Sequence, residues 1–258
     1  MAEMAELKLG AQLYTVRQYM QTEKDFGETL KKIAAIGYKY VQVSGIGAAV
    51  TPAAIKNAAE DNNIKVILTH TPPDRIKNEP EKVIEDHELF NCGAIGIGGM
   101  FGHERTEDGY KRFAEDFAYA IEKIKNSGKV FLYHNHDFEF EKYNGKTGMD
   151  IVLENTDKDG LKLTFDTYWA QYAGVDPIGF IEKYNNRIFA THLKDMIITD
   201  GKPSMTEIYT GSMDFDGILD ISKKTGVFWH FVEQDEVKIN AFESLKISYD
   251  NLMASNKF

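Results

Sequence analysis

Three short apolar runs of this chain each stop on a residue type that binds metals or moves protons. Asp166 ends the run Leu-Thr-Phe-Asp, His192 ends Ile-Phe-Ala-Thr-His, and Glu233 ends Phe-Val-Glu. A buried strand has no use for an ionisable end unless that end opens onto a site. Imidazole nitrogens and carboxylate oxygens are ligands of divalent cations, so the three ends predict a metal or catalytic cluster.

A fourth run, Val130–Tyr133, is followed by two histidines, His134 and His136. Both point to the same side if the strand continues, because side chains repeat every two residues. We take His134 as the fourth ligand, since it is nearer the apolar run, and His136 as a proton-transfer group or substrate contact. The reverse assignment stays open. Two histidines and two carboxylates suit Mn²⁺, Zn²⁺, Co²⁺ or Fe²⁺ better than Ca²⁺.

Further polar residues fall near the same strand ends. His70 ends Val-Ile-Leu-Thr-His and is a candidate for a substrate contact or an acid/base group, with a structural role as the alternative. Lys194 lies two residues after His192 and could hold a substrate oxygen or stabilise an enediolate; a surface lysine is the alternative. Trp169 could stack on a sugar ring or belong to the core. Weaker candidates are Gln12, Asp195, Gln234 and Asp235.

Strands must carry these residues to one place, and the chain contains eight evenly spaced apolar runs. They lie near Leu7–Tyr14, Tyr40–Val43, Lys65–His70, Ala94–Gly98, Val130–His134, Leu161–Asp166, Ile188–His192 and Phe228–Glu233. Their spacing of roughly 25–40 residues is that of a βα unit. We therefore expect a single (β/α)₈ TIM barrel over residues 1–258, which gathers the carboxyl ends of its strands into one mouth.

Helix signals separate the runs. Residues 109–127 place apolar side chains at helical spacing, and Gly128 follows. Thr51 and Asp176, each followed by proline, and Asp214 and Asn240 are predicted N-caps. The segments Gly99–Glu107, Phe138–Thr147 and Asp195–Met213 are predicted as long loops around the mouth.

Composition excludes several classes of protein. The formal net charge of -10 argues against a large footprint on nucleic acid, and the single cysteine excludes an intrachain disulfide framework. No apolar stretch reaches the roughly 20 residues of a membrane span. The start, Met1 to Glu6, does not read as a signal peptide. We expect a cytoplasmic protein, with export after removal of a leader as the alternative, and we leave a homo-oligomer open.

The motifs around these residues carry a resemblance. The strings Tyr-His-Asn-His-Asp-Phe-Glu-Phe from Tyr133, Phe-Asp-Thr-Tyr-Trp from Phe165, Thr-His-Leu-Lys-Asp from Thr191 and Val-Glu-Gln-Asp from Val232 closely resemble the sugar phosphate isomerase/epimerase family. That family belongs to the xylose isomerase-like barrel superfamily. The resemblance runs in order from about Gln12 to Leu252.

The resemblance implies one divalent metal at the barrel mouth. In relatives such as ketose 3-epimerases the ligands are Glu, Asp, His and Glu from strands five to eight; Asp166, His192 and Glu233 match the last three. His134 stands where the first Glu would be, so a two-glutamate proton exchange would be compromised and a histidine would have to act as the other base. Within the first motif, Glu139 is assigned to substrate binding.

The leading interpretation is a divalent-metal-dependent isomerase or epimerase that abstracts a proton next to the carbonyl of a sugar or keto-sugar. Glu233, His136 and Lys194 are the predicted catalytic residues, and a small carbohydrate is the predicted partner. Relatives resembling inosose dehydratases and 3-keto-glycoside lyases make β-elimination the alternative. A non-catalytic carbohydrate-binding barrel is an alternative of another class. Apurinic endonucleases of the superfamily carry a histidine at the position of Trp169, so DNA repair is disfavoured and no nucleic acid is expected.

Overall fold

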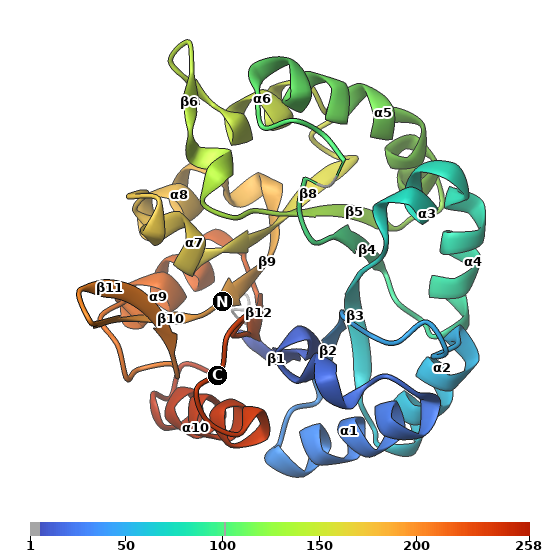
Figure 1. Ribbon diagram of the computed structural model, residues 1–258, viewed down its shortest axis with the longest axis vertical. Helices are drawn as coiled ribbons and strands as arrows, with labels where there is room; N and C mark the ends of the chain where they lie inside the picture. The colour runs from blue at the N-terminus through green and yellow to red at the C-terminus, as the bar shows by residue number, and fades with distance from the viewer. Residues whose placement is uncertain (1–5, 101) are drawn as a thin grey trace, which may run out of the picture.

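Eight parallel strands close into a barrel in this computed structural model, which describes residues 6–100 and 102–258 (Figure 1). The strands are β1 (Lys8–Gln12), β2 (Tyr40–Val43), β3 (Lys65–His70), β4 (Ala94–Ile97), β5 (Val130–His134), β8 (Leu161–Asp166), β9 (Ile188–Leu193) and β12 (Trp229–Val232). Around the barrel they follow the order β1-β12-β9-β8-β5-β4-β3-β2. The predicted (β/α)₈ barrel is confirmed, and the eight predicted runs coincide with its strands to within about two residues at each end.

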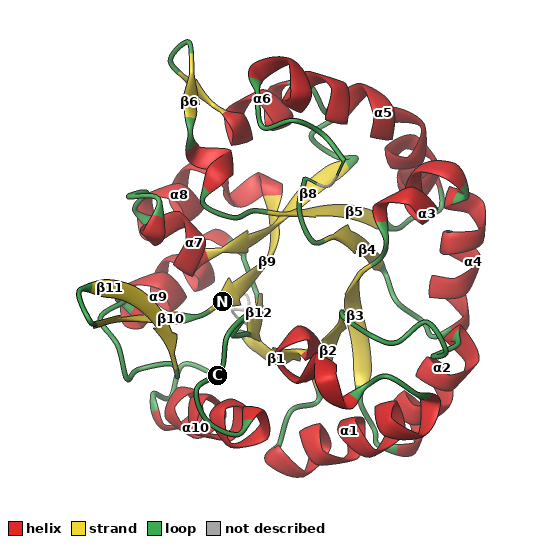
Figure 2. Cartoon of the chain, viewed as in Figure 1, coloured by secondary structure: helices red, strands yellow, loops and turns green. Residues whose placement is uncertain are grey.

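Helices form a ring outside the strands (Figure 2). The α-helices are α1 (Glu23–Ile36), α2 (Pro52–Asp61), α3 (Pro73–Asn78), α4 (Pro80–Leu89), α5 (Glu107–Asn126), α6 (Gly148–Glu154), α7 (Thr167–Tyr172), α8 (Pro177–Tyr184), α9 (Phe215–Thr225) and α10 (Ala241–Ala254). Short 3₁₀ turns occupy η1 (Leu13–Tyr19), η2 (Phe138–Phe140) and η3 (Asn185–Arg187). The predicted caps hold: the side chains of Thr51, Asp176, Asp214 and Asn240 all accept backbone N–H groups at their helix starts.

A small apolar layer fills the barrel interior directly below the mouth. It consists of Leu68, Ala94, Leu132, Ala190 and Phe231, all fully buried. Four of these precede by two residues a polar residue predicted to lie at the mouth, so the period of two along a strand puts both on the inner face. The side chains inside the barrel therefore change from apolar to polar, mostly ionisable, between this layer and the next one toward the mouth.

Two of the predicted loops are partly strand, which corrects the sequence interpretation. Phe138–Thr147 contains the hairpin β6 (Lys142–Tyr143) and β7 (Lys146–Thr147), and Asp195–Met213 contains β10 (Asp195–Thr199) and β11 (Lys202–Thr206). Each turns through two residues with positive φ, Asn144-Gly145 and Asp200-Gly201. Such dipeptides are the preferred two-residue hairpin turns, so the signal was present in the sequence.

The remaining predicted loop, Gly99–Glu107, connects β4 to α5, and its residue 101 lies outside the described part of the chain. The same holds for residues 1–5, on which the signal-peptide prediction rests.

Candidate metal centre and active site

Four neighbouring strands deliver the four predicted ligands to one point. His134 is the last residue of β5 and Asp166 the last of β8. His192 lies near the end of β9, paired in register with Asp166, and Glu233 follows β12. All four side chains are buried, and one potential ligand atom from each lies within 4.8 Å of the others. Neighbouring strands of a parallel barrel place their ends side by side, which is why residues 99 positions apart in sequence meet.

The distances within this cluster match the spacing of ligands around one ion. His134 Nε2 lies 3.1 Å from Asp166 Oδ2, and His192 Nδ1 lies 2.8 Å from Glu233 Oε2 and 3.8 Å from Asp166 Oδ2. Donor atoms that sit about 2–2.3 Å from a metal are roughly 3 Å from one another. The buried His/Asp/His/Glu cluster could therefore hold a divalent ion.

Hydrogen bonds on the far side of each imidazole set which nitrogen faces the cluster. His134 Nδ1 donates to the Gly98 carbonyl oxygen at 3.3 Å, and His192 Nε2 donates to Gln42 Oε1 at 2.6 Å. The other nitrogen of each ring then presents a lone pair to a carboxylate oxygen. Two acceptors at about 3 Å repel unless a cation or a proton lies between them. This orientation fits a metal.

Two hydrogen bonds hold Asp166 in place. Its backbone N–H donates to Asn135 Oδ1 at 2.9 Å, and its Oδ1 accepts the Trp169 N–H at 2.9 Å as the N-cap of α7. Oδ2 is thus left for the cluster. Burial would raise the pKa of Asp166, but Lys194 outweighs it, with help from His134, and holds the pKa well below its usual range. The carboxylate is therefore ionised at neutral pH.

Lys194 places a buried ammonium beside this cluster. Its Nζ lies 2.8 Å from Asp166 Oδ2, 3.0 Å from Glu233 Oε2 and 2.7 Å from Asp235 Oδ2. Burial lowers the pKa of a lysine, yet Asp166, Glu233 and Asp235 together raise that of Lys194 well above its usual value. The same ammonium and His192 keep the pKa of Glu233 below its ordinary value, although burial opposes them.

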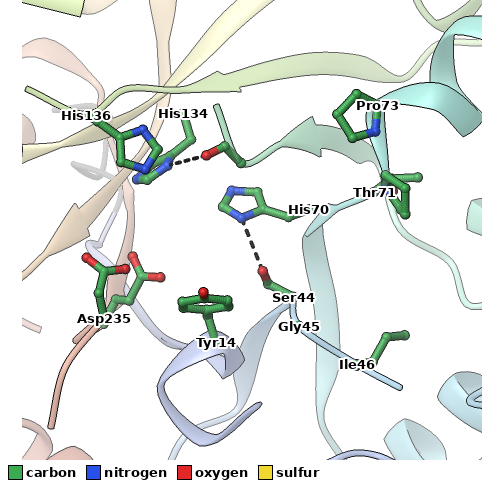
Figure 3. Close-up of a pocket in the computed structure, with 13 residues that line it drawn as sticks. Tyr14, Ser44, Gly45, Ile46, His70, Thr71, Pro73, His134, His136 and Asp235 are labelled. Atoms are coloured by element: carbon green, nitrogen blue, oxygen red, sulfur yellow. Dashed lines mark hydrogen bonds between the residues drawn. The ribbon is translucent and has the colours of Figure 1, made fainter. Parts of the chain in front are cut away.

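A pocket of about 540 Å³ opens above the cluster (Figure 3). Its walls include two of the cluster residues, His134 and Glu233, together with Tyr14, Ser44, His70, His136 and Asp235. Ser44 Oγ lies 3.2 Å and Gln12 Nε2 lies 3.5 Å from His70 Nδ1. The Nε2 atom of His70 and the Nδ1 atom of His136 are buried without a hydrogen-bond partner.

Both pocket histidines are neutral at physiological pH. Burial, His134 and Lys194 lower the pKa of His136 to about 3. Burial and the neighbouring histidines hold the pKa of His70 well below its usual value. A neutral imidazole can accept a proton or bind a substrate hydroxyl.

Three residues predicted to bind substrate do not line this pocket. Gln12 is buried beneath His70. Trp169 is half-buried, with its ring centroid 5.9 Å from that of His136. The carboxylate of Glu139 accepts the Tyr133 hydroxyl at 2.7 Å and the His136 N–H at 2.7 Å. Glu139 therefore orients the segment that carries His136 and is turned away from the pocket.

Sequence reasoning missed several residues that shape the site. Ser44 and Gln42 lie at the end of β2, and the strand-end rule that found His70 could have found them. Tyr14 follows β1 in the same way. Asn135 carried no signal, because its contact with Asp166 depends on how β5 and β8 pair.

A family model described as a xylose isomerase-like TIM barrel matches residues 30–236. The chain belongs to this family.

The xylose isomerase-like chain is similar to inosose dehydratase of Lacticaseibacillus casei, with 26% identity over 156 residues. That alignment covers 54% of this chain and 52% of the relative, so the chain spans about half the length of the curated relative it matches. A sugar phosphate isomerase/epimerase from Parabacteroides distasonis superposes with a TM-score of 0.82 at 24% identity and covers 100% of this chain and 97% of its own. L-ribulose 3-epimerase superposes with a TM-score of 0.74 at 15% identity, covering 96% of this chain and 94% of its own.

The family to which the chain belongs contains enzymes, and the structural matches at this identity establish the barrel fold. Within residues 6–100 and 102–258, no helix is long and apolar enough to cross a membrane.

Proposed function

We propose that this protein is a divalent-metal-dependent isomerase or epimerase that removes a proton next to the carbonyl of an uncharged sugar or keto-sugar. The observation that carries the proposal is the position of Glu233. Its carboxylate belongs to the His/Asp/His/Glu cluster and also forms part of the pocket wall. One side chain can therefore contact both a metal ion and a substrate carbon.

His134, Asp166, His192 and Glu233 would hold the metal, as Mn²⁺, Zn²⁺, Co²⁺ or Fe²⁺. When bound, such an ion polarises a carbonyl and its neighbouring hydroxyl and so acidifies the adjoining C–H. The Glu233 carboxylate, ionised because Lys194 and His192 lower its pKa, is placed to take that proton. Returning it to the former carbonyl carbon, while the hydroxyl proton passes to the former carbonyl oxygen, gives isomerisation.

Epimerisation needs a second group that exchanges a proton on the other face of the same carbon. The sequence contains only one of the two glutamates expected for this, but neutral His136 and His70 both face the pocket. Lys194 would stabilise the negative charge that develops on the substrate oxygen. These roles make Glu233, His136 and Lys194 the proposed catalytic residues.

The charge of the pocket argues for an unphosphorylated substrate. Two carboxylates, Glu233 and Asp235, line it, and no lysine or arginine is among its described lining residues. A phosphate dianion would meet these two carboxylates and no lysine or arginine among the described residues of the pocket wall. We therefore propose a neutral carbohydrate of monosaccharide to small-glycoside size.

Proton exchange with solvent tests this proposal. The metal-loaded protein is incubated in D₂O with a panel of neutral keto-sugars and polyols and their phosphate esters, and deuterium at carbons next to the carbonyl is followed by NMR. We expect exchange with at least one neutral substrate and a loss of about 10²–10⁴-fold in Glu233→Gln. Glu236→Gln, an exposed glutamate three residues away, is the matched control. Exchange confined to phosphate esters, or absent throughout, would refute the proposal.

The similarity to an inosose dehydratase favours a second candidate, β-elimination of a hydroxyl or glycosyl group from a 3-keto-glycoside or inosose-like substrate. The same proton next to the carbonyl is removed. In the elimination, however, the hydroxyl or glycosyl group then leaves the β-carbon, and the proton is not returned to carbon. Formation of an α,β-unsaturated ketone, seen by its ultraviolet absorbance, separates the two. A non-catalytic binding barrel would bind sugar without exchange, and Glu233→Gln would leave its sugar affinity unchanged.

A further inference from the structure

Lys194 is the only lysine among the fully buried large side chains of the described chain. It lies two residues beyond His192, so it occupies the same inner face one layer nearer the mouth. Its ammonium contacts three carboxylates at 2.7–3.0 Å, from Asp166, Glu233 and Asp235. Besides a contact with substrate oxygen, these partners give Lys194 a second role.

The ammonium and the metal require the same two oxygen atoms. Lys194 contacts Oδ2 of Asp166 and Oε2 of Glu233, and these are the atoms that face His134 and His192. An ion about 2–2.3 Å from either oxygen would come within roughly 5 Å of Nζ. Two positive charges at that separation in a buried site repel strongly, so both cannot keep their best positions on the shared oxygens.

Asp235 offers the ammonium a position of its own. Its Oδ2 is the nearest of the three oxygens to Nζ, and Asp235 is not one of the four cluster residues. Its side chain is 26% exposed and lines the pocket (Figure 3). Counted together, the three carboxylates and the ammonium leave two negative charges in excess, which one divalent ion neutralises. The site therefore accommodates both cations, provided that the ammonium moves away from the shared oxygens.

We propose that Lys194 is a built-in competitor for the metal, which withdraws its ammonium from Asp166 and Glu233 to Asp235 when the ion binds. This inference rests on the proposed metal-dependent function. Without a metal ion, the Lys194 ammonium neutralises the carboxylates. When an ion binds, the ammonium moves to the pocket wall, where it contacts the substrate oxygen. Metal binding and assembly of the substrate site are then one event.

Mn²⁺ affinity, measured by isothermal titration calorimetry at fixed pH, tests the competition. We expect Lys194→Met to bind Mn²⁺ at least tenfold more tightly than the unaltered protein, because the competing charge is gone. Asp235→Asn should weaken Mn²⁺ binding, because the ammonium loses its alternative partner. Lys238→Met, which alters an exposed lysine three residues after Asp235, is the control and should leave the affinity unchanged.

A double variant separates competition from a general electrostatic effect. If Asp235 acts by receiving the ammonium, Asp235→Asn changes Mn²⁺ affinity less than twofold in the Lys194→Met background. If Asp235 acts through its charge alone, the two effects add, and the proposed movement is wrong. Unchanged or weaker Mn²⁺ binding by Lys194→Met would overturn the competition itself.

Thermal unfolding provides a readout that does not depend on activity. Lys194→Met should melt at a lower temperature than the unaltered protein without metal, and should gain more from saturating Mn²⁺. Lys194→Gln replaces Lys194→Met if the latter does not fold, with the same expectations. If neither the unaltered protein nor the lysine variants bind any metal, the proposed function is refuted as well. If metal binds but its affinity does not depend on Lys194, only this inference is refuted.

Discussion

At the residue scale, the roles of His134 and His136 follow from the surroundings of each ring. His134 Nδ1 donates to the Gly98 carbonyl, and His134 Nε2 lies beside Asp166 Oδ2, so both ring nitrogens already have partners at the cluster. The His136 ring stacks on Phe138 at 5.3 Å and keeps its Nδ1 without a partner. We therefore propose that His134 is a metal ligand and that His136 contacts the substrate.

Replacing each of these histidines by alanine tests the assignment. We expect His134→Ala to lower the metal content of the purified protein, whereas His136→Ala keeps the metal and loses turnover by about 10²-fold or more. Elemental analysis and the deuterium exchange rate measure the two quantities. Reversed outcomes would exchange the two roles, and two variants that keep both metal and turnover would make the motif structural.

Gln42 fixes the His192 ring by accepting its Nε2–H at 2.6 Å. Loss of such a partner lowers metal affinity by roughly 10–100-fold, because the ring is no longer held with Nδ1 toward the ion. We therefore expect this weakening of Mn²⁺ binding in Gln42→Leu and none in Gln18→Leu, which alters an exposed glutamine. Equal affinities for the two variants would mean that the hydrogen bond does not orient the ligand.

At the scale of elements, the segment after β5 owes its shape to Glu139. Burial raises the pKa of this carboxyl to about 7, although Tyr133 and the His136 N–H oppose the rise by hydrogen bonding to it. The folded protein thus keeps a proton that the unfolded chain, with a pKa near 4.5, releases. Because the folded state binds more protons in this interval, stability falls as pH rises from about 4.5 to about 7.

Glu139→Gln should flatten this dependence, since the amide does not titrate. We expect the fall in unfolding free energy between these pH values to shrink by about 1–3 kcal/mol in the variant. Urea denaturation at a series of pH values from 4.5 to 8 measures it. Parallel curves for the two proteins would show that Glu139 does not titrate in this range.

The strands, the helix caps and the apolar faces of the helices were predictable because each depends on residues close together in sequence. Phe113 and Phe117 lie at helical spacing, and both are buried in α5. Strand ends likewise predicted which residues reach the mouth. Contacts such as Lys194 with Asp235 and Asn135 with Asp166 were not predictable, since they depend on side-chain reach and on the pairing of distant strands. The inward turn of Glu139 escaped prediction for the same reason.

At the scale of the whole molecule, the net charge is the basis for predicting that this barrel does not bind nucleic acid. The net charge of -10 gives a long-range repulsion from phosphate backbones, and two carboxylates line the pocket. We expect no measurable binding to duplex DNA with an abasic site at physiological salt, as judged by fluorescence anisotropy. Tight binding that weakens steeply as salt is raised would contradict this expectation.

The order of strands divides the barrel into two contiguous halves. The His/Asp/His/Glu cluster comes from β5, β8, β9 and β12, whereas Tyr14, Ser44 and His70 of the pocket wall belong to the β1–β3 side. Within the described residues, two hydrogen bonds to ligand side chains come from the other half, one from the Gln42 side chain and one from the Gly98 carbonyl after β4. Side chains of the β1–β4 half could therefore be exchanged to reshape the pocket without altering the four cluster residues, as long as those two hydrogen bonds are kept.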